Sequence, residues 1–182
     1  MIIRPATPAD LPACMAVDIS YRSGQVWQMR LQRGDVLAEG EEGLFVSFHP
    51  VRLPHPLLLT PPGIRERLSA GWQRRALTLV LEEGNAIYGY IAVEVRAGQR
   101  LGWVEALAVA PERRRQGWGS RLLQEAILWG RSRNLRALIF ETPARNAPAI
   151  ALAQRLGFVF CGYHEQYYEE AEVALFFAFP LE

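Results

Sequence analysis

An apolar strand-like run that passes through a glycine-rich corner directly into a helix-like run is the feature that most constrains this sequence. Residues 101–110 read as a strand, three arginines at 113–115 precede Gly117 and Gly119, and 116–133 have the apolar spacing of a helix. The first amides of a helix lack intrahelical acceptors, and glycine lets a bulky anion approach them. The corner therefore predicts an anion site with room for a pyrophosphate.

Two known phosphate-binding patterns do not fit this corner. The nucleotide-binding P-loop needs a lysine and a longer spacing between its glycines, whereas the chain has no lysine at all. The dinucleotide pattern G-x-G-x-x-G is incomplete, because Leu122 stands where its third glycine belongs. A solvated, flexible helix start and a nucleotide-phosphate site both stay open as alternatives.

The order of the remaining patterns predicts an α/β fold with a mixed sheet, since meandering strands are followed by a strand-helix-strand unit. Prolines 54, 56, 61 and 62 predict a break after the hairpin. The expected elements are a strand at 2–4, a helix at 7–19, a hairpin from 26–34 and 44–54, a helix at 63–75, strands at 76–83, 86–97 and 101–110, a helix at 116–133, a strand at 135–142, a helix at 147–156, and strands at 158–163 and 172–179.

Length and charge narrow the class of protein. A chain of 182 residues fits one domain, here with an extended β-rich insertion at about 25–60. The net charge of +1 gives no general attraction to nucleic acid or to an anionic membrane. Two cysteines and three scattered histidines form neither a disulfide framework nor a metal-binding spacing. The start has no leader pattern, so we expect a cytoplasmic protein with a small partner, and a homodimer stays open.

Two linked motifs resemble the GNAT superfamily of acetyl-CoA-dependent N-acetyltransferases. The family's phosphate loop, Arg/Gln-x-x-Gly-x-Gly/Ala, is matched by Arg114, Gly117 and Gly119, and RNAPAIALAQRLGF at 145–158 resembles its next block. The opening RPATPADLPA is also typical of the family. Within it, ETPARNAPA, GFVFCGYHEQYY, EVALFFAF and LFVSFHPVRLP resemble the streptothricin acetyltransferases.

The resemblance implies a mostly antiparallel sheet, with helices on both faces, whose fourth and fifth strands splay apart to hold acetyl-CoA. Backbone groups of three residues in the fourth strand pair with the pantetheine arm, amides at 116–120 hold the pyrophosphate, and an asparagine lies near the lower part of the cofactor. The residues that the resemblance assigns to the cofactor are Leu107, Ala108, Val109, Arg114, Arg115, Gln116, Gly117, Trp118, Gly119, Ser120 and Asn146.

Acetyl transfer to an amine needs a base, because an ammonium with a pKa near 10.4 is protonated at neutral pH. Glu105 is the candidate, since many relatives place an acidic residue on the fourth strand. If side chains alternate there, Trp103, Glu105 and Leu107 share one face. The alternative is a solvated glutamate or one paired with an arginine.

The general acid is less direct to assign. Many relatives carry a tyrosine where this chain has Ala153, so the usual donor is absent. Tyr168 matches an aromatic region of the streptothricin-type enzymes and is our candidate for protonating the leaving thiolate, with Tyr163 and Tyr167 as rivals. Half-buried packing is the alternative role for these tyrosines.

The function predicted from these features is acetyl transfer from acetyl-CoA to an amine. The acceptor is a small polyamine-like or aminoglycan-like molecule, an antibiotic such as streptothricin, or a protein amino group. A non-catalytic acyl-CoA-binding or regulatory domain is the alternative that Ala153 keeps open. Acidic residues expected to flank the acceptor favour a cation; they are Glu39, Glu41, Glu42, Glu165, Glu169 and Glu170.

Overall fold

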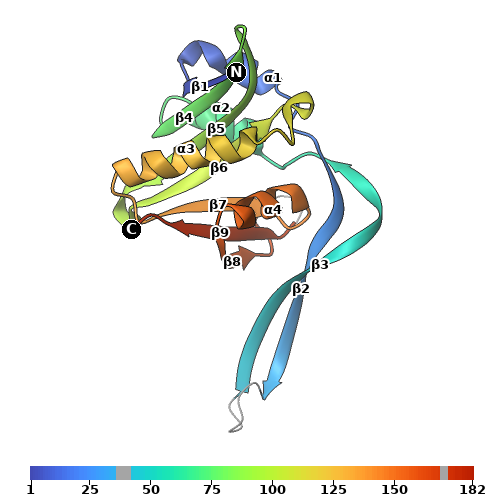
Figure 1. Cartoon of the computed structure of the whole chain (residues 1–182). Helices are drawn as coiled ribbons and strands as arrows, with labels where there is room; N and C mark the ends of the chain where they lie inside the picture. Colours follow the sequence, from blue (N-terminus) through green and yellow to red (C-terminus); the bar gives the residue numbers. More distant parts are fainter. Residues whose placement is uncertain (36–41, 169–171) are drawn as a thin grey trace.

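A seven-stranded mixed sheet and a long two-stranded arm form the framework of the molecule (Figure 1). The computed structural model describes residues 1–35, 42–168 and 172–182. The strands are β1 (Ile2–Pro5), β2 (Tyr21–Asp35), β3 (Glu42–Leu59), β4 (Leu77–Glu83), β5 (Ala86–Arg96), β6 (Leu101–Val109), β7 (Ala137–Pro143), β8 (Val159–His164) and β9 (Ala174–Pro180), and the helices are α1 (Leu11–Ala16), α2 (Ile64–Gly71), α3 (Trp118–Ser132) and α4 (Ala147–Arg155).

The main sheet has the strand order β1-β4-β5-β6-β7-β9-β8. Its neighbouring strands pair antiparallel except β6 and β7, which pair parallel. A parallel pair needs a crossover, and α3 supplies it between the two strands. The predicted mixed α/β sheet is therefore confirmed.

Helices cover both faces of this sheet, and each face has its own apolar core. On β5, Ile91 belongs to the core that contains residues of α3 and α4, whereas Tyr90 belongs to the core beneath α1 and α2. This follows from the alternation of side chains along a strand buried on both faces. The α3 and α4 core is the larger, and it includes the fully buried Leu122, Leu138 and Phe177.

The predicted hairpin is present as the β2–β3 arm, which extends well away from the main sheet (Figure 1). The expected proline break is wrong in part, because Pro54 and Pro56 lie inside β3. Ser23 pairs with Leu57, whereas Gln25 pairs with Arg52, so the strand register shifts between these pairs. Both prolines lie in the unpaired stretch of β3 at this shift, where a proline's missing N–H removes no hydrogen bond between the strands. The chain leaves the arm at Pro61 and Pro62 instead.

The single helix predicted at 7–19 is also wrong. A 3-10 turn at Pro8–Asp10 is followed by α1, which ends where Val17 becomes extended. Pro12 lacks the N–H that a continuous helix would direct to the carbonyl of Pro8, which accounts for the change of helix type. The early chain is then fixed by Asp10, whose carboxylate accepts hydrogen bonds from Arg4 at 2.8 and 2.9 Å.

Candidate functional site

The fork between β6 and β7 is the centre of the site. Their pairing runs from Leu101 with Ala137 to Val104 with Phe140, although β6 continues to Val109 and β7 to Pro143. Beyond the last pair the two strands separate (Figure 1). The splayed pair of strands expected from the family resemblance is therefore confirmed.

Two glutamates follow this fork. Glu105 comes directly after the last paired residue of β6, and Glu141 directly after the last paired residue of β7. Their side chains are only 14% and 7% exposed. Sequence reasoning identified Glu105 and missed Glu141, although LGWVE and ALIFE place a glutamate at the same position of two parallel strands.

A β-bulge surrounds Glu105. Ala92 pairs with Ala106 and Val93 with Val104, so Glu105 is an extra residue with no partner of its own on β5. The bulge breaks the alternation along β6: Val104 and Leu107 both pack in the α3 and α4 core. The prediction that Trp103, Glu105 and Leu107 share a face is therefore wrong.

Arg67 of α2 lies between the two carboxylates. Its Nε is 3.7 Å from Oε2 of Glu105, and its Nη2 is 3.9 Å from Oε1 of Glu141. The same Nε donates to the Glu105 carbonyl at 3.4 Å. Sequence reasoning missed Arg67 because nothing in the pattern separates it from the chain's other arginines.

The local environment favours the neutral form of Glu105. Burial raises the pKa of Glu105 above the ordinary glutamate value, and the negative charges of Glu141 and Glu94 add to this. The positive charges of Arg67 and Arg75 act in the opposite direction. A carboxylate with a raised pKa is a stronger base, which suits it to accept a proton from an amine.

Aromatic side chains stand beside the carboxylates. The hydroxyl of Tyr168 donates to Oε1 of Glu141 at 3.0 Å, and Tyr167 contacts both Tyr168 and Phe176 with ring centroids 5.2 and 5.4 Å apart. Burial and the charge of Glu141 raise the pKa of Tyr168, so the hydroxyl keeps its proton at neutral pH. Trp103 packs against Phe176 with ring centroids 5.8 Å apart. The rings of Tyr167, Tyr168, Phe176 and Trp103 together form an aromatic wall beside the carboxylates.

Two other positions bear on the choice of a proton donor. Tyr163 pairs with Leu175 and contacts Phe48 of the arm edge to face, with ring centroids 5.2 Å apart, on the sheet face that carries the α3 and α4 core. Ala153 is fully buried in that same core. A tyrosine at 153 would not fit without displacing its neighbours. Of the candidate proton donors, Tyr167 and Tyr168 are the ones that lie near Glu141.

The predicted anion corner forms the start of α3. Gly117 precedes the helix with φ of 86°, and the first bond into the helix runs from the Arg121 amide to the Gly117 carbonyl at 3.0 Å. The amides before Arg121 therefore have no intrahelical acceptor. A β-carbon at Gly119 would make only an ordinary contact, 3.5 Å from Leu152, so packing does not require glycine there.

The corner arginines are mostly occupied by the protein itself. The Arg114 guanidinium donates to the carbonyls of Val109, Ser20 and Asp18, at 2.6 Å for Val109 and 2.9 Å for Asp18. Arg113 pairs with Glu83, whereas Arg115 is exposed. Arg114 thus fixes the corner to the connection between α1 and β2.

The remaining residues assigned to the cofactor line the fork and the corner. Ala108 is buried, while Leu107 and Val109 are half-buried, and all three lie on β6 beyond its last pair with β7. The Asn146 side chain caps α4 by accepting from the Ala149 amide at 3.2 Å. Gln116 is exposed, whereas Trp118 and Ser120 are half-buried at the start of α3.

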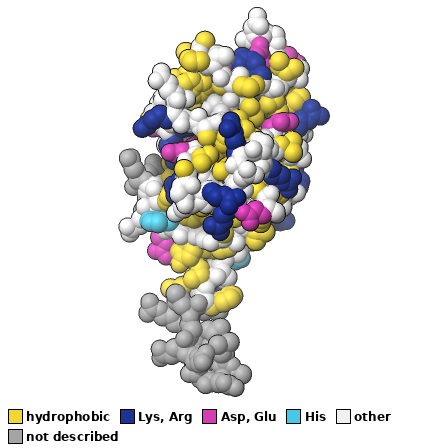
Figure 2. Space-filling view, turned by 90° about the vertical axis from the view of Figure 1, so that its left-hand side faces the viewer, with side chains coloured by type: hydrophobic (Ala, Val, Ile, Leu, Met, Phe, Trp, Pro, Cys, Tyr) yellow, Lys and Arg dark blue, Asp and Glu magenta, His cyan; other side chains and the backbone are white. Residues whose placement is uncertain are grey.

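Arg155 of α4 is a basic residue at the corner that sequence reasoning did not single out. Its Nη2 donates to the hydroxyl of Ser120 at 3.1 Å. On the face shown in Figure 2, arginine side chains are dispersed among acidic and apolar ones. That face does not present the continuous basic stripe typical of nucleic-acid binding.

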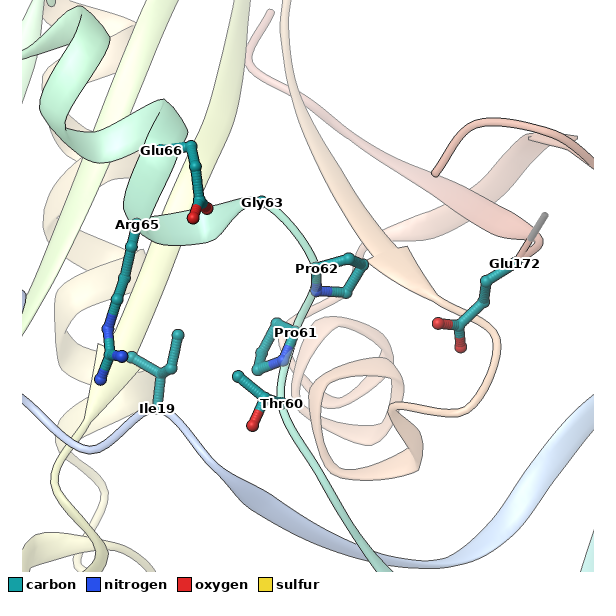
Figure 3. A pocket seen from close by; sticks show the side chains of 8 residues that line it. All are labelled: Ile19, Thr60, Pro61, Pro62, Gly63, Arg65, Glu66 and Glu172. Atoms are coloured by element: carbon teal, nitrogen blue, oxygen red, sulfur yellow. The ribbon is translucent and has the colours of Figure 1, made fainter. Parts of the chain in front are cut away.

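A cavity of about 310 Å³ lies at the start of α2. The segment from Thr60 to Gly63 crosses it, Ile19 and Arg65 line one side, and Glu172 lies on the other (Figure 3). Because α2 starts at its edge, the cavity adjoins the helix that carries Arg67.

Several of the acidic residues predicted near the acceptor cannot be placed. Glu39, Glu41, Glu169 and Glu170 lie outside the described residues, and Glu42 begins β3 with its side chain undescribed. Glu165 is exposed in the turn after β8. Across the described ranges, no three His, Cys, Asp or Glu side chains are grouped to hold a metal. Within the same ranges, no helix is long and apolar enough to cross a membrane.

Comparison with known proteins decides the family. The profile of the Acetyltransferase (GNAT) family matches residues 50–158, a span that includes β6, the corner and α4. The chain belongs to this family. It is an acetyl-CoA-dependent N-acetyltransferase, and the non-catalytic alternative is not favoured.

Three relatives align with nearly the whole chain. The streptothricin acetyltransferase of Streptomyces lavendulae is 28% identical over 187 residues, which cover 97% of this chain and 93% of that protein. The crystal structure of a nourseothricin acetyltransferase matches with a TM-score of 0.79 at 26% identity, covering 100% of this chain and 98% of the other. A Bacillus anthracis protein assigned as a streptothricin acetyltransferase and solved with acetyl coenzyme A shares the fold, with a TM-score of 0.76, 18% identity and 98% coverage of both chains.

Proposed function

We propose that the protein transfers acetyl from acetyl-CoA to a primary amine of a small cationic molecule of the streptothricin type. The observation that carries this is the pair of buried carboxylates, Glu105 and Glu141, at the fork of β6 and β7. Buried carboxylates attract a cation, and the aromatic wall beside them adds a favourable surface for it. The similarity to the Streptomyces lavendulae enzyme along the whole chain supports the same class of acceptor.

Acetyl-CoA is held mainly by backbone groups in this proposal. The amides of 116–120 at the start of α3 receive the pyrophosphate, since they point out of the helix and Gly119 leaves the approach open. The unpaired edge of β6 at Leu107, Ala108 and Val109 receives the pantetheine arm. Arg115 and Trp118 flank the pyrophosphate, and Asn146 lies at the β7 side of the fork.

Glu105 is the base in the proposed reaction. It accepts a proton from the acceptor ammonium, directly or through a water, and the neutral nitrogen then attacks the thioester carbonyl. Such proton transfer contributes about 10²–10⁴ to the rate in enzymes generally. Glu105 is the extra residue of the bulge in β6, at the point where β6 and β7 separate.

Tyr168 is the proposed proton donor to the departing thiolate, and the second proton that the attacking nitrogen loses as the amide forms restores the tyrosine hydroxyl. Its hydroxyl is directed at Glu141, so donation to the sulfur requires the hydroxyl to rotate away from that carboxylate. Glu141 thus orients Tyr168 and is also the second carboxylate, with Glu105, of the proposed cation site. Tyr167, which contacts Tyr168, is the alternative donor.

A turnover assay tests the proposed function. The protein is incubated with acetyl-CoA and, separately, with streptothricin, spermidine and a peptide with a free N-terminal alanine, and the products are identified by mass. Acetylated streptothricin or spermidine supports the proposal. Modification of the peptide alone would make a protein amino group the acceptor. Competition of ATP with acetyl-CoA at equal affinity would instead favour a nucleotide-phosphate site.

A further inference from the structure

The contacts of Arg67 with the two carboxylates are loose. Its nitrogens lie 3.7 Å from Glu105 and 3.9 Å from Glu141, whereas charge-assisted hydrogen bonds between such groups are about 2.7–2.9 Å long. The guanidinium therefore lies beside both glutamates without closing a tight pair with either, and its single positive charge compensates them only in part. Its side chain is 31% exposed, so it has room to move.

The charges around Glu105 do not balance. Glu94 and Glu141 act on it as negative neighbours, and Arg67 and Arg75 act as positive ones. Among these described groups, three carboxylates face two guanidiniums. The surplus is negative, and a cation placed near Glu105 and Glu141 would reduce it.

Arg67 also lies beside the cavity at the start of α2, although it is not one of the residues that line it. Gly63 lines that cavity, and Nη1 of Arg67 lies 3.3 Å from the position that a β-carbon on Gly63 would occupy. The other nitrogens of the same guanidinium contact the carboxylates. The guanidinium therefore lies close both to Gly63, which lines the cavity seen in Figure 3, and to the two glutamates.

We propose that Arg67 is a built-in substitute for the acceptor's ammonium group, and that a cationic amine bound at the fork displaces it from between Glu105 and Glu141. The proposal rests on the proposed function for the identity of the acceptor site. Arg67 then determines specificity, because a neutral molecule cannot compensate the carboxylates once the guanidinium has left. It also compensates part of the charge of the pair while the site holds no acceptor.

Binding of a simple cation tests this without turnover. Propylammonium is titrated into the protein without acetyl-CoA, and affinity is measured by calorimetry and by tryptophan fluorescence. Removing an internal competitor should raise affinity, so Arg67→Met should bind propylammonium about tenfold more tightly than the unmodified protein if Arg67 occupies the site about nine-tenths of the time. Adding Glu141→Gln to Arg67→Met should abolish the gain.

Arg65→Met is the matched control, because Arg65 belongs to the same helix but donates to the Val17 carbonyl. It should leave the affinity for propylammonium unchanged. Unchanged, weaker or undetectable binding to a folded Arg67→Met protein overturns the proposal. Arg67→Gln is measured in the same way if the methionine variant does not fold. Tighter binding without any acetylated product would contradict the proposed function and leave the role of Arg67 standing.

Discussion

The corner at the start of α3 and the fork between β6 and β7 are the proposed sites of opposite charges, and they are built by opposite means. The corner offers backbone amides near the surface, with Gly117 exposed and Gly119 half-buried. The fork offers two buried side-chain carboxylates with a guanidinium between them. Backbone amides carry no net charge and stay unpaired at a helix start at little cost, whereas buried carboxylates need compensation.

The use of arginine in the two regions shows what this difference requires. At the corner, Arg114 donates its hydrogen bonds to backbone carbonyls and Arg113 pairs with Glu83. The proposed anion site therefore does not depend on an unpaired guanidinium from either residue. At the fork, Arg67 of α2, a helix far from β6 and β7 in the sequence, contacts both carboxylates. Substitutions should therefore act through shape at the corner and through charge at the fork.

The largest effect is expected at the fork. Glu105→Gln keeps the shape of the side chain but removes its basicity, so kcat should fall by about 10²–10⁴ with little change in acetyl-CoA affinity. The exposed Glu94, which also acts electrostatically on Glu105, provides the control variant Glu94→Gln, and its effect should be far smaller. Full activity of Glu105→Gln on an identified acceptor would show that Glu105 is structural.

The pH dependence of the unmodified enzyme should report the same carboxylate. The base works only when deprotonated, and its pKa is raised, so the acidic limb of kcat/KM should lie above the ordinary glutamate range. In Glu105→Gln this limb should disappear, and the activity deficit should narrow as pH rises, because more of the acceptor amine is then neutral. A limb at the ordinary glutamate value in the unmodified enzyme would contradict this assignment.

Tyr168→Phe should lower kcat by about 10², at the small end of the range for general acids. The deficit should change little with pH, since the phenol of Tyr168 stays protonated across the working range. Tyr167→Phe is the comparison, because Tyr167 lies against Tyr168. A larger loss in Tyr167→Phe than in Tyr168→Phe would exchange their roles.

The corner and the fork also differ in how far the sequence alone predicts them. The corner is local: Arg114, Gly117 and Gly119 lie within six residues, and the helix start that uses them is encoded in the same stretch. The fork joins β6, β7, α2 and the segment after β8, so its geometry depends on strand register. The bulge at Glu105 and the contact of Arg67 have no signal in the residue pattern.

At the corner, Gly119→Val should weaken acetyl-CoA binding by roughly 1.5–3 kcal/mol, the range for losing a hydrogen bond to a charged group. The side chain would stand between the helix-start amides and the pyrophosphate. Gly98→Val is the control, since a β-carbon there meets nothing within 4 Å. Calorimetric affinity equal to that of the unmodified protein would remove Gly119 from the cofactor site.

Arg114→Ala should weaken acetyl-CoA binding by about 1 kcal/mol, because it loosens the attachment of the corner to Ser20 and Asp18 rather than removing a phosphate contact. The loss should be equal with acetyl-CoA and with its 3′-dephospho analogue. A smaller loss with the dephospho analogue would show that Arg114 binds the ribose phosphate directly.

The smallest effect expected is a gain in stability from Glu105→Gln. The pKa of Glu105 is raised in the folded state, so the folded state binds this proton more tightly than the unfolded chain does. The charged carboxylate therefore destabilises the fold above its folded pKa, and this penalty fades as pH falls and is gone below the unfolded value of about 4.3. Glu105→Gln should raise the thermal midpoint at neutral pH and lose that advantage in acid. An equal midpoint at neutral pH would mean that Arg67 compensates the charge fully, contrary to the loose contact at the fork.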